Sequence, residues 1–114
     1  LTSAGIAMLS CRPQHEIDDW LADRKFISYT PYTVTSPEQL RENIERAKIQ
    51  GYALIEQQLT PLVRGIAVPI RFRSGELAGA VNISLHMGNE TSERAVARAL
   101  PLLREVEYAL ESAF

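Results

Sequence analysis

Three stretches rich in apolar and β-branched residues follow one another in the second half of the chain. They cover residues 52–57, 63–72 and 77–85, and the turn residues 73–76 separate the last two. This pattern predicts three short strands, the last two joined as a hairpin. Pro69 within the middle stretch predicts an edge position or a bulge, because proline cannot donate a hydrogen bond to a neighbouring strand.

The first quarter of the chain predicts two helices. Residues 1–11 carry small and apolar groups, and Pro13 suits the first position of a second helix. Residues 25–32 predict an extended or loop segment. The apolar residues that share a helical face are Ala4, Met8 and Cys11 in the first helix, and Ile17, Trp20 and Leu21 in the second.

The clearest helix start lies at Ser36. Its hydroxyl is suited to capping, Pro37 fits the first turn, Gln39 completes a capping box, and Gly51 supplies a left-handed stop. The pattern predicts a buried face and two charge pairs at four-residue spacing. The buried face is Leu40, Ile44 and Ala47, and the pairs are Arg41 with Glu45 and Glu42 with Arg46.

A long helix is predicted from Thr91 or Ser92 to the end of the chain. Pro101 inside it removes one backbone hydrogen bond, so a kink or a break into two pieces is expected. The expected apolar face is Val96, Leu100, Leu103, Val106 and Leu110. Helices, then a three-stranded antiparallel meander, then a helix predict an α+β fold.

Length and charge narrow the function classes. The 114 residues suit a single domain, and a formal net charge of −2 lacks the basic excess of a nucleic-acid-binding surface. No apolar run approaches the roughly 20 residues that cross a bilayer, so no membrane contact is expected. The single cysteine, Cys11, excludes an internal disulfide and favours a reducing compartment such as the cytoplasm. Because the chain starts at Leu1 with no leader, we expect an internal part of a longer protein.

No arrangement of residues predicts catalysis. A nucleophile needs a base within hydrogen-bond reach. His15 lies early in a charged helix and is expected at the solvated surface, and His86 follows the last strand, where it could reach the mouth of a pocket. Cys11 has apolar helical neighbours and is predicted to be a small buried hydrophobe. One cysteine and two distant histidines match no metal-ligand spacing. The sequence therefore predicts no enzyme, no metal site and no cofactor.

The two hairpin strands carry small residues on one face. Alternation places Ala78, Ala80, Asn82 and Ser84 together on the last strand, and Gly65, Ala67 and Pro69 together on the strand before it. One interpretation is a cavity in which Asn82 and Ser84 bind a carboxylate or a hydroxyl. The other is a helix packed closely on this face, with Asn82 and Ser84 bonded to backbone. The pattern alone favours neither.

An ordered set of short segments runs along nearly the whole chain. They are Ser3-Ala4-Gly5, Tyr29-Thr30-Pro31, Thr33-Val34-Thr35, Gly51-Tyr52-Ala53, Arg64-Gly65-Ile66-Ala67-Val68-Pro69-Ile70, Ala80-Val81-Asn82-Ile83-Ser84 and Leu100-Pro101-Leu102-Leu103-Arg104. In order and spacing, the set resembles the effector-binding domain of IclR-family transcriptional regulators. The pieces from the two hairpin strands are most similar to the branch that controls aromatic-acid catabolism through the β-ketoadipate pathway.

This resemblance implies a GAF-like or profilin-like antiparallel sheet flanked by helices. It implies a domain, residues 1–114, that binds a small organic or aromatic acid and forms homodimers or homotetramers. DNA would be read by a winged helix-turn-helix domain that lies N-terminal to it. The first helix and strands of the effector domain are also expected to precede Leu1.

The resemblance also implies a set of ligand-binding residues. Backbone groups near Ser3 and Ala4 would hold a carboxylate, and Asn82 and Ser84 match a polar pair on the last strand. The complete implied set is Ser3, Ala4, Ile55, Glu56, Gly65, Asn82 and Ser84. Three positions depart from the family: Ile55, with Glu56 beside it, replaces an acidic residue, Gly65 replaces Cys or Ser, and Ile6 replaces Lys or Arg. A pocket with fewer polar groups is expected to prefer a larger or less polar effector, such as an aromatic acid.

The sequence thus predicts an effector-binding and oligomerisation domain of a bacterial regulator of catabolic genes. Two alternatives remain: a small enzyme on a GAF-like fold, and an oligomerisation module without a ligand.

Overall fold

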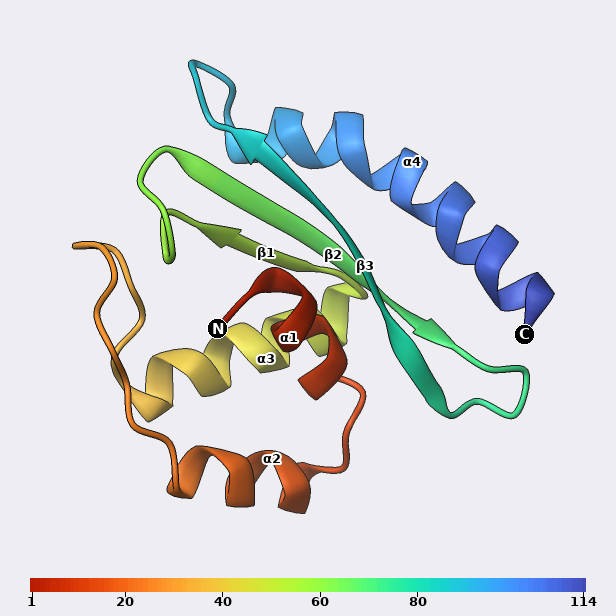
Figure 1. Ribbon diagram of the computed structural model, residues 1–114, viewed down its shortest axis with the longest axis horizontal. Coiled ribbons are helices and arrows are strands. Elements are labelled where there is room, and N and C mark those ends of the chain that lie inside the picture. Colours follow the sequence, from red (N-terminus) through yellow and green to blue (C-terminus); the bar gives the residue numbers. More distant parts are fainter.

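A computed structural model describes residues 1–114 as four helices and one three-stranded sheet (Figure 1). Neighbouring strands follow the chain order β1-β2-β3, and both pairs are antiparallel. The predicted α+β fold with a meander is therefore confirmed. The elements are α1 (Ser3–Leu9), α2 (Gln14–Ala22), α3 (Pro37–Gln50), β1 (Ala53–Glu56), β2 (Val63–Arg71), β3 (Leu77–His86) and α4 (Ser92–Ala113).

The sheet separates two hydrophobic cores. Figure 1 shows α4 along one side of the sheet and α1, α2 and α3 on the other. Because side chains alternate along β2, this strand contributes to both cores. Ile66, Val68 and Ile70 pack with Ala99 and other residues of α4, whereas Ala67 packs with residues of α1, α2 and α3.

Helix α3 begins and ends where the sequence predicts. The Ser36 hydroxyl accepts a hydrogen bond from the backbone N–H of Gln39 at 3.1 Å, although the reciprocal bond of a full capping box is not formed. Gly51 has a φ of 82°, and its N–H donates to the Ala47 carbonyl at 2.8 Å. The expected buried residues are confirmed: Leu40, Ile44 and Ala47.

The charge pairs predicted on the outer face of α3 are wrong. Arg41 forms an ion pair with Asp18 of α2, and Arg46 donates to Asn43. Residue spacing within α3 cannot reveal a partner on another helix, so it paired Arg41 with Glu45 and not with Asp18.

Helix α1 buries a different face from the one predicted. Ser3, Ile6 and Ala7 are buried, whereas Ala4 and Met8 are half-buried. The helix ends at Leu9, so Cys11 lies beyond it. The reason is that α1 contacts the sheet and α3 at once, and this choice of face depends on residues far away in sequence.

Helix α2 starts one residue later than predicted. Pro13 is the residue before the helix and Gln14 is the first within it. Ile17 and Leu21 are buried and Trp20 packs against the same core, as expected.

Pro69 occupies a place where only one side of β2 is paired. The strand is central in the sheet, but its pairing with β1 ends at Ala67. Pro69 therefore has a neighbour only in β3, where it faces Ala80, and the register shifts immediately afterwards between Ile70 and Arg71. Pro69 thus has the unpaired side that was predicted for an edge position, and the adjacent register shift is the predicted irregularity.

Helix α4 runs from Ser92 to Ala113 without interruption, so a break at Pro101 is wrong. The Thr91 hydroxyl caps its start by accepting from the N–H of Arg94 at 3.2 Å. Its buried residues are Ala95, Ala99 and Leu103, and Val106 is 42% exposed. Val96, Leu100 and Leu110 pack against the same core, so the predicted face is confirmed except at Val106, and Ala95 and Ala99 belong to it as well. None of the helices has both the length and the apolar character required to cross a membrane.

Candidate functional site

The hairpin strands β2 and β3 bring the small residues of the predicted face into direct register. Gly65 lies opposite Ser84, Ala67 opposite Asn82, and Pro69 opposite Ala80. Residues directly opposite in an antiparallel pair point to the same side of the sheet. The shared small-residue face inferred from alternation is therefore confirmed.

Helix α1 covers one part of this face. An added Cβ at Gly65 would lie 2.7 Å from the Ser3 hydroxyl oxygen and 3.2 Å from the Ser3 Cβ, so only glycine permits this approach. Asn82 and Ser84 are exposed, and their side chains make no hydrogen bond to backbone. A helix therefore packs closely on this face at Gly65, as one interpretation predicted. The face is open at Asn82 and Ser84, as the other interpretation requires.

A cavity of about 180 Å³ lies beside this contact, and we call it the strand-face cavity. Residues from α1, the sheet and the connection between β1 and β2 line it. They are Thr2, Ser3, Ile55, Gln58, Leu59, Thr60, Val63, Gly65, Asn82 and Ser84.

Polar side chains without partners in the protein converge on the strand-face cavity. Ser3 is 3% exposed and Gln58 is 8% exposed, yet neither side chain forms a hydrogen bond. No fully buried side-chain nitrogen or oxygen lacks a partner, so the polar atoms of Ser3 and Gln58 are open to water, and both residues line the cavity. Together with Thr60, Asn82 and Ser84 they offer hydroxyl and amide groups that donate and accept hydrogen bonds.

Five of the seven residues in the predicted set line the strand-face cavity: Ser3, Ile55, Gly65, Asn82 and Ser84. Ala4 is half-buried in α1 and does not line it. Ile6, the third departure from the family pattern, is 1% exposed and belongs to the hydrophobic core.

Glu56 is a correction to the predicted set. It follows Ile55 on a strand, so its side chain points to the opposite face of the sheet. There its carboxylate accepts hydrogen bonds from Arg64 Nε and from the Ser92 hydroxyl, both at 2.8 Å. The guanidinium of Arg64, which is 2% exposed, also donates to the carbonyls of Glu90 and Thr91 at 3.1 Å. This network joins the strands to the start of α4 and plays no part in the cavity.

Sequence reasoning missed the contribution of the connection between β1 and β2. Gln58 and Thr60 lie in a segment without periodicity, and its positive φ of 59° at Gln57 is unusual for a non-glycine residue. The Thr33 hydroxyl donates to the Gln58 carbonyl at 2.5 Å, and Thr30 donates to the Gln57 carbonyl. The only sequence signal was the cluster of threonines between residues 30 and 35.

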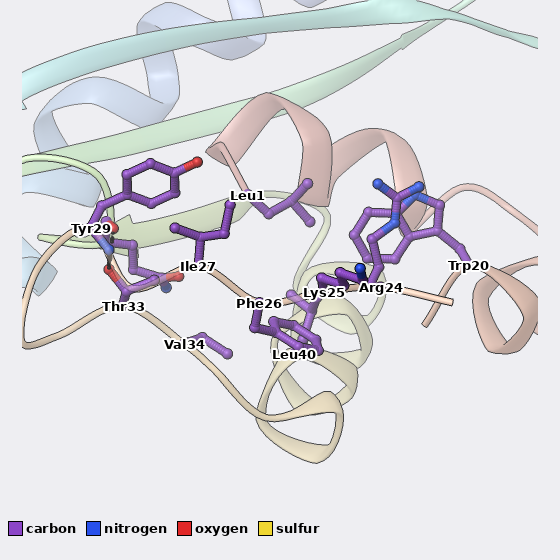
Figure 2. A pocket seen from close by; sticks show the side chains of 11 residues that line it. Leu1, Trp20, Arg24, Lys25, Phe26, Ile27, Tyr29, Thr33, Val34 and Leu40 are labelled. Atoms are coloured by element: carbon purple, nitrogen blue, oxygen red, sulfur yellow. Dashed lines mark hydrogen bonds between the residues drawn. The ribbon is translucent and has the colours of Figure 1, made fainter. Parts of the chain in front are cut away.

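A second cavity, of about 160 Å³, was not predicted (Figure 2). It lies between the first residue of the chain, the end of α2, residues 25–34 and the start of α3, and seven of its eleven lining residues are hydrophobic. Trp20, Phe26 and Tyr29 are among them, and we call it the aromatic cavity. Gln58 is the one residue that lines both cavities.

The titratable groups do not form a catalytic arrangement in either cavity. His15 and His86 are exposed and line neither cavity, and the Cys11 thiol donates to the Ala7 carbonyl at 3.5 Å. Hydrogen bonds from Arg41 and Arg98 lower the pKa values of Asp18 and Glu90, both outside the two cavities. No group of three or more His, Cys, Asp and Glu side chains is placed to share a metal ion.

Comparisons with known proteins agree on one family. Residues 1–111 match the C-terminal domain of the bacterial transcriptional regulator IclR. The Pca regulon regulatory protein of Pseudomonas putida is 32% identical over 102 residues, which cover 90% of this chain and 35% of that protein. The chain therefore spans about a third of the length of this curated relative.

Solved structures show the same architecture. A crystal structure of a candidate transcriptional regulator from Rhodococcus sp. RHA1 superposes with a TM-score of 0.92 at 30% identity, over 97% of this chain and 45% of the other. The inducer-binding domain of the transcription factor PobR from Acinetobacter, a double mutant in complex with 3-hydroxybenzoic acid, superposes with a TM-score of 0.87 at 25% identity. That match covers 96% of this chain and 63% of the other. These relatives are regulators of transcription and not enzymes, in agreement with the sequence prediction.

Proposed function

The chain belongs to the IclR C-terminal family of bacterial transcriptional regulators, and on that premise we propose that it binds a small organic acid in the strand-face cavity. The acid would act as the effector of a regulator of transcription. DNA contact would come from a winged helix-turn-helix domain outside these 114 residues, so the protein would work in the cytoplasm, where the DNA is.

The observation that carries this proposal is a pair of buried polar side chains without partners. Ser3 and Gln58 reach the strand-face cavity from α1 and from the β1–β2 connection, and Asn82 and Ser84 line it from β3. Their polar atoms are open to water in the cavity, so an acid that enters it can replace that water as their hydrogen-bond partner. A carboxylate accepts such bonds in charge-assisted form, which makes them stronger than bonds between neutral groups.

The size of the cavity supports an acid with a single ring. A cavity of roughly 150 Å³ in another protein accommodates benzene, and the strand-face cavity measures about 180 Å³. Ile55, where an acidic residue was expected, gives this cavity an apolar side. The PobR domain in complex with 3-hydroxybenzoic acid and the Pca regulon relative favour the same class. We therefore propose an aromatic acid, and a regulator in the aromatic-acid branch that controls catabolic genes.

Gly65 does not enlarge the cavity for a ligand, whereas the sequence interpretation expected it to favour a larger effector. The space left by its missing side chain is filled by Ser3 of α1 and is not available to a ligand. The proposed preference for a less polar acid therefore rests on Ile55. The hydroxyl expected at position 65 is supplied instead by Ser3.

The proposed mechanism is a shift in domain arrangement. An acid that contacts α1 and β3 together binds best to the arrangement in which they are close, and the difference in affinity sets the shift. Coupling free energies between two such sites are typically about 1–3 kcal/mol. A homodimer or homotetramer would convey this change to the DNA-binding domains.

Substitutions on β3 test the site. We expect Asn82→Ala and Ser84→Ala each to weaken benzoate binding about three- to tenfold, since each removes one hydrogen bond. Because both side chains are exposed, the melting temperature without ligand should change little. Isothermal titration calorimetry measures the affinity, and Ser74→Ala, in the turn of the same hairpin, is the matched control. Unchanged affinity in both variants would remove the assignment, and binding of acetate alone from a panel of acids would reject the aromatic class.

A thermal-shift titration separates an effector domain from an oligomerisation module without a ligand. A bound effector stabilises the folded state, so the melting temperature should rise with benzoate concentration and saturate. A melting temperature that does not respond to any acid in the panel would favour the oligomerisation module.

A further inference from the structure

The aromatic cavity differs in chemistry from the strand-face cavity. Figure 2 shows Tyr29 at one end and Trp20 with Arg24 at the other, with Leu1 and Phe26 between them. Polar hydroxyl and amide groups dominate the strand-face cavity, whereas here most of the lining is hydrophobic. The cavity is partly open to solvent, and its volume of about 160 Å³ has the size for one ring or a short branched chain.

Two cations border this apolar cavity. Arg24 and Lys25 line the cavity, and neither belongs to any of the four ion pairs of the protein. The guanidinium carbon of Arg24 lies 4.1 Å from the centre of the Trp20 ring, which holds its charge at this place through a cation–π contact. An apolar body with an anionic head satisfies both parts of this lining.

Gln58 connects the two cavities. This residue lines both, and the hydroxyl of Thr33, which lines the aromatic cavity, donates to the Gln58 backbone carbonyl at 2.5 Å. A molecule that displaces residues 29–33 would therefore move a wall of the strand-face cavity.

We propose that the aromatic cavity is a second binding site, which takes a compact carboxylate with an aromatic or branched apolar body. Lys25 and Arg24 bind the carboxylate, and Trp20, Phe26 and Leu40 enclose the body. Occupation of this site changes the affinity of the strand-face cavity through Gln58.

Trp20 provides a direct readout of this site. It is the only tryptophan of the chain, and it lines the aromatic cavity but not the strand-face cavity. In a titration of the protein with sodium benzoate at constant ionic strength, we expect a saturable change in tryptophan fluorescence. Acetate, which lacks the apolar body, and benzyl alcohol, which lacks the charge, should each bind at least about tenfold more weakly.

Charge variants locate the signal. Lys25→Gln removes an exposed charge at the cavity and should raise the apparent Kd for benzoate about tenfold. Lys48→Gln removes the same charge from the exposed side of α3, away from both cavities, and should leave it unchanged. Val34→Phe, which fills the cavity without changing its charge, should abolish the fluorescence response, and circular dichroism checks that it folds.

The double variant Asn82→Ala, Ser84→Ala separates the two sites. We expect it to keep the fluorescence response to benzoate, while calorimetry shows the loss of one of two binding events. The proposal is overturned if benzoate gives no saturable fluorescence change. Loss of that change in the β3 double variant together with its survival in Lys25→Gln would also overturn it, since one site on β3 would then explain all binding. Equal weakening by Lys25→Gln and Lys48→Gln would overturn it as well, because it would indicate general charge screening.

Discussion

At Gly65 the absence of a side chain sets the distance between α1 and β2. We expect Gly65→Ala to lower the free energy of unfolding by about 1–3 kcal/mol, because the new methyl group overlaps Ser3 and forces the helix or the strand to shift. The same shift moves the Ser3 hydroxyl, so benzoate should bind more weakly as well. Urea denaturation and calorimetry measure the two effects.

Gly79→Ala is the matched control for this residue. Gly79 lies in the neighbouring strand β3, and an added Cβ there would meet no atom within 4 Å. Its stability should stay within about 0.5 kcal/mol of the unchanged protein or rise slightly, since alanine restricts the unfolded chain. Equal losses in both variants would show that the contact with Ser3 is not the cause.

Some residues of the strand-face cavity could be placed from the local sequence pattern, and others only from contacts between distant parts of the chain. Asn82 and Ser84 were placed on one face by alternation alone, and register confirmed it. The role of Gly65 was not predictable, because it depends on Ser3, which is 62 positions away in sequence and meets it only in the folded protein. The resemblance matches the family's acidic position to Ile55, and Glu56 entered the set only as the acid beside it; alternation along β1 turns Glu56 to the opposite face, where it contacts Arg64 and Ser92.

At the scale of elements, the buried Arg64 network attaches α4 to the sheet. We expect Arg64→Met to lower the free energy of unfolding by about 2–4 kcal/mol. The substitution leaves the Glu56 carboxylate, 29% exposed, without its ion-pair partner and removes the donors to the carbonyls of Glu90 and Thr91. Denaturation with urea measures the change.

Arg41→Met provides the comparison for this prediction. It breaks an ion pair with Asp18 in which both side chains are about half exposed, at 47% and 48%. Exposed pairs contribute about 0–1 kcal/mol, so this variant should lose much less stability. A cost for Arg64→Met as small as that for Arg41→Met would contradict a role for the buried network.

Local sequence signals predicted where the helices and strands begin and end better than they predicted which residues of each helix are buried. The start and end of α3 depend on Ser36 and Gly51, which act within a few residues, and both predictions were confirmed. The face of α4 was predicted correctly except at Val106, since Leu103 is buried and Val96, Leu100 and Leu110 pack against the same core; the contribution of Ala95 and Ala99 was missed because small residues carry little hydrophobic signal. The aromatic cavity was missed because five separate segments form it, and none of them alone shows a pattern that predicts a cavity.

For the whole molecule, acid pH should reduce stability through exposed carboxylates. Arg98 donates to Glu90 at 2.7 and 3.0 Å, and these hydrogen bonds hold the pKa of Glu90 below its ordinary value of 4.5. A pKa that is lower in the folded state than in the unfolded state contributes stability above the unfolded value. That contribution is lost as the pH falls through the folded value.

We therefore expect the free energy of unfolding to decrease as the pH is lowered below 4.5. Glu90→Gln should make this decrease shallower, and the difference should be small because the pair lies at the surface. Urea denaturation at a series of pH values measures both slopes. Identical slopes with and without Glu90 would contradict the assignment, and added salt should weaken the effect in the unchanged protein.

Strand β2 supplies alternate residues to the two cores, with Ala67 on one side and Ile66, Val68 and Ile70 on the other. Neither layer of helices can detach without uncovering one face of the same strand. Local opening at α1 or at α4 is therefore an event of lower cost than separation of the sheet itself. The amide protons of β2 should consequently be the slowest in the protein to exchange with deuterium, because the strand stays covered on one face when either layer opens alone.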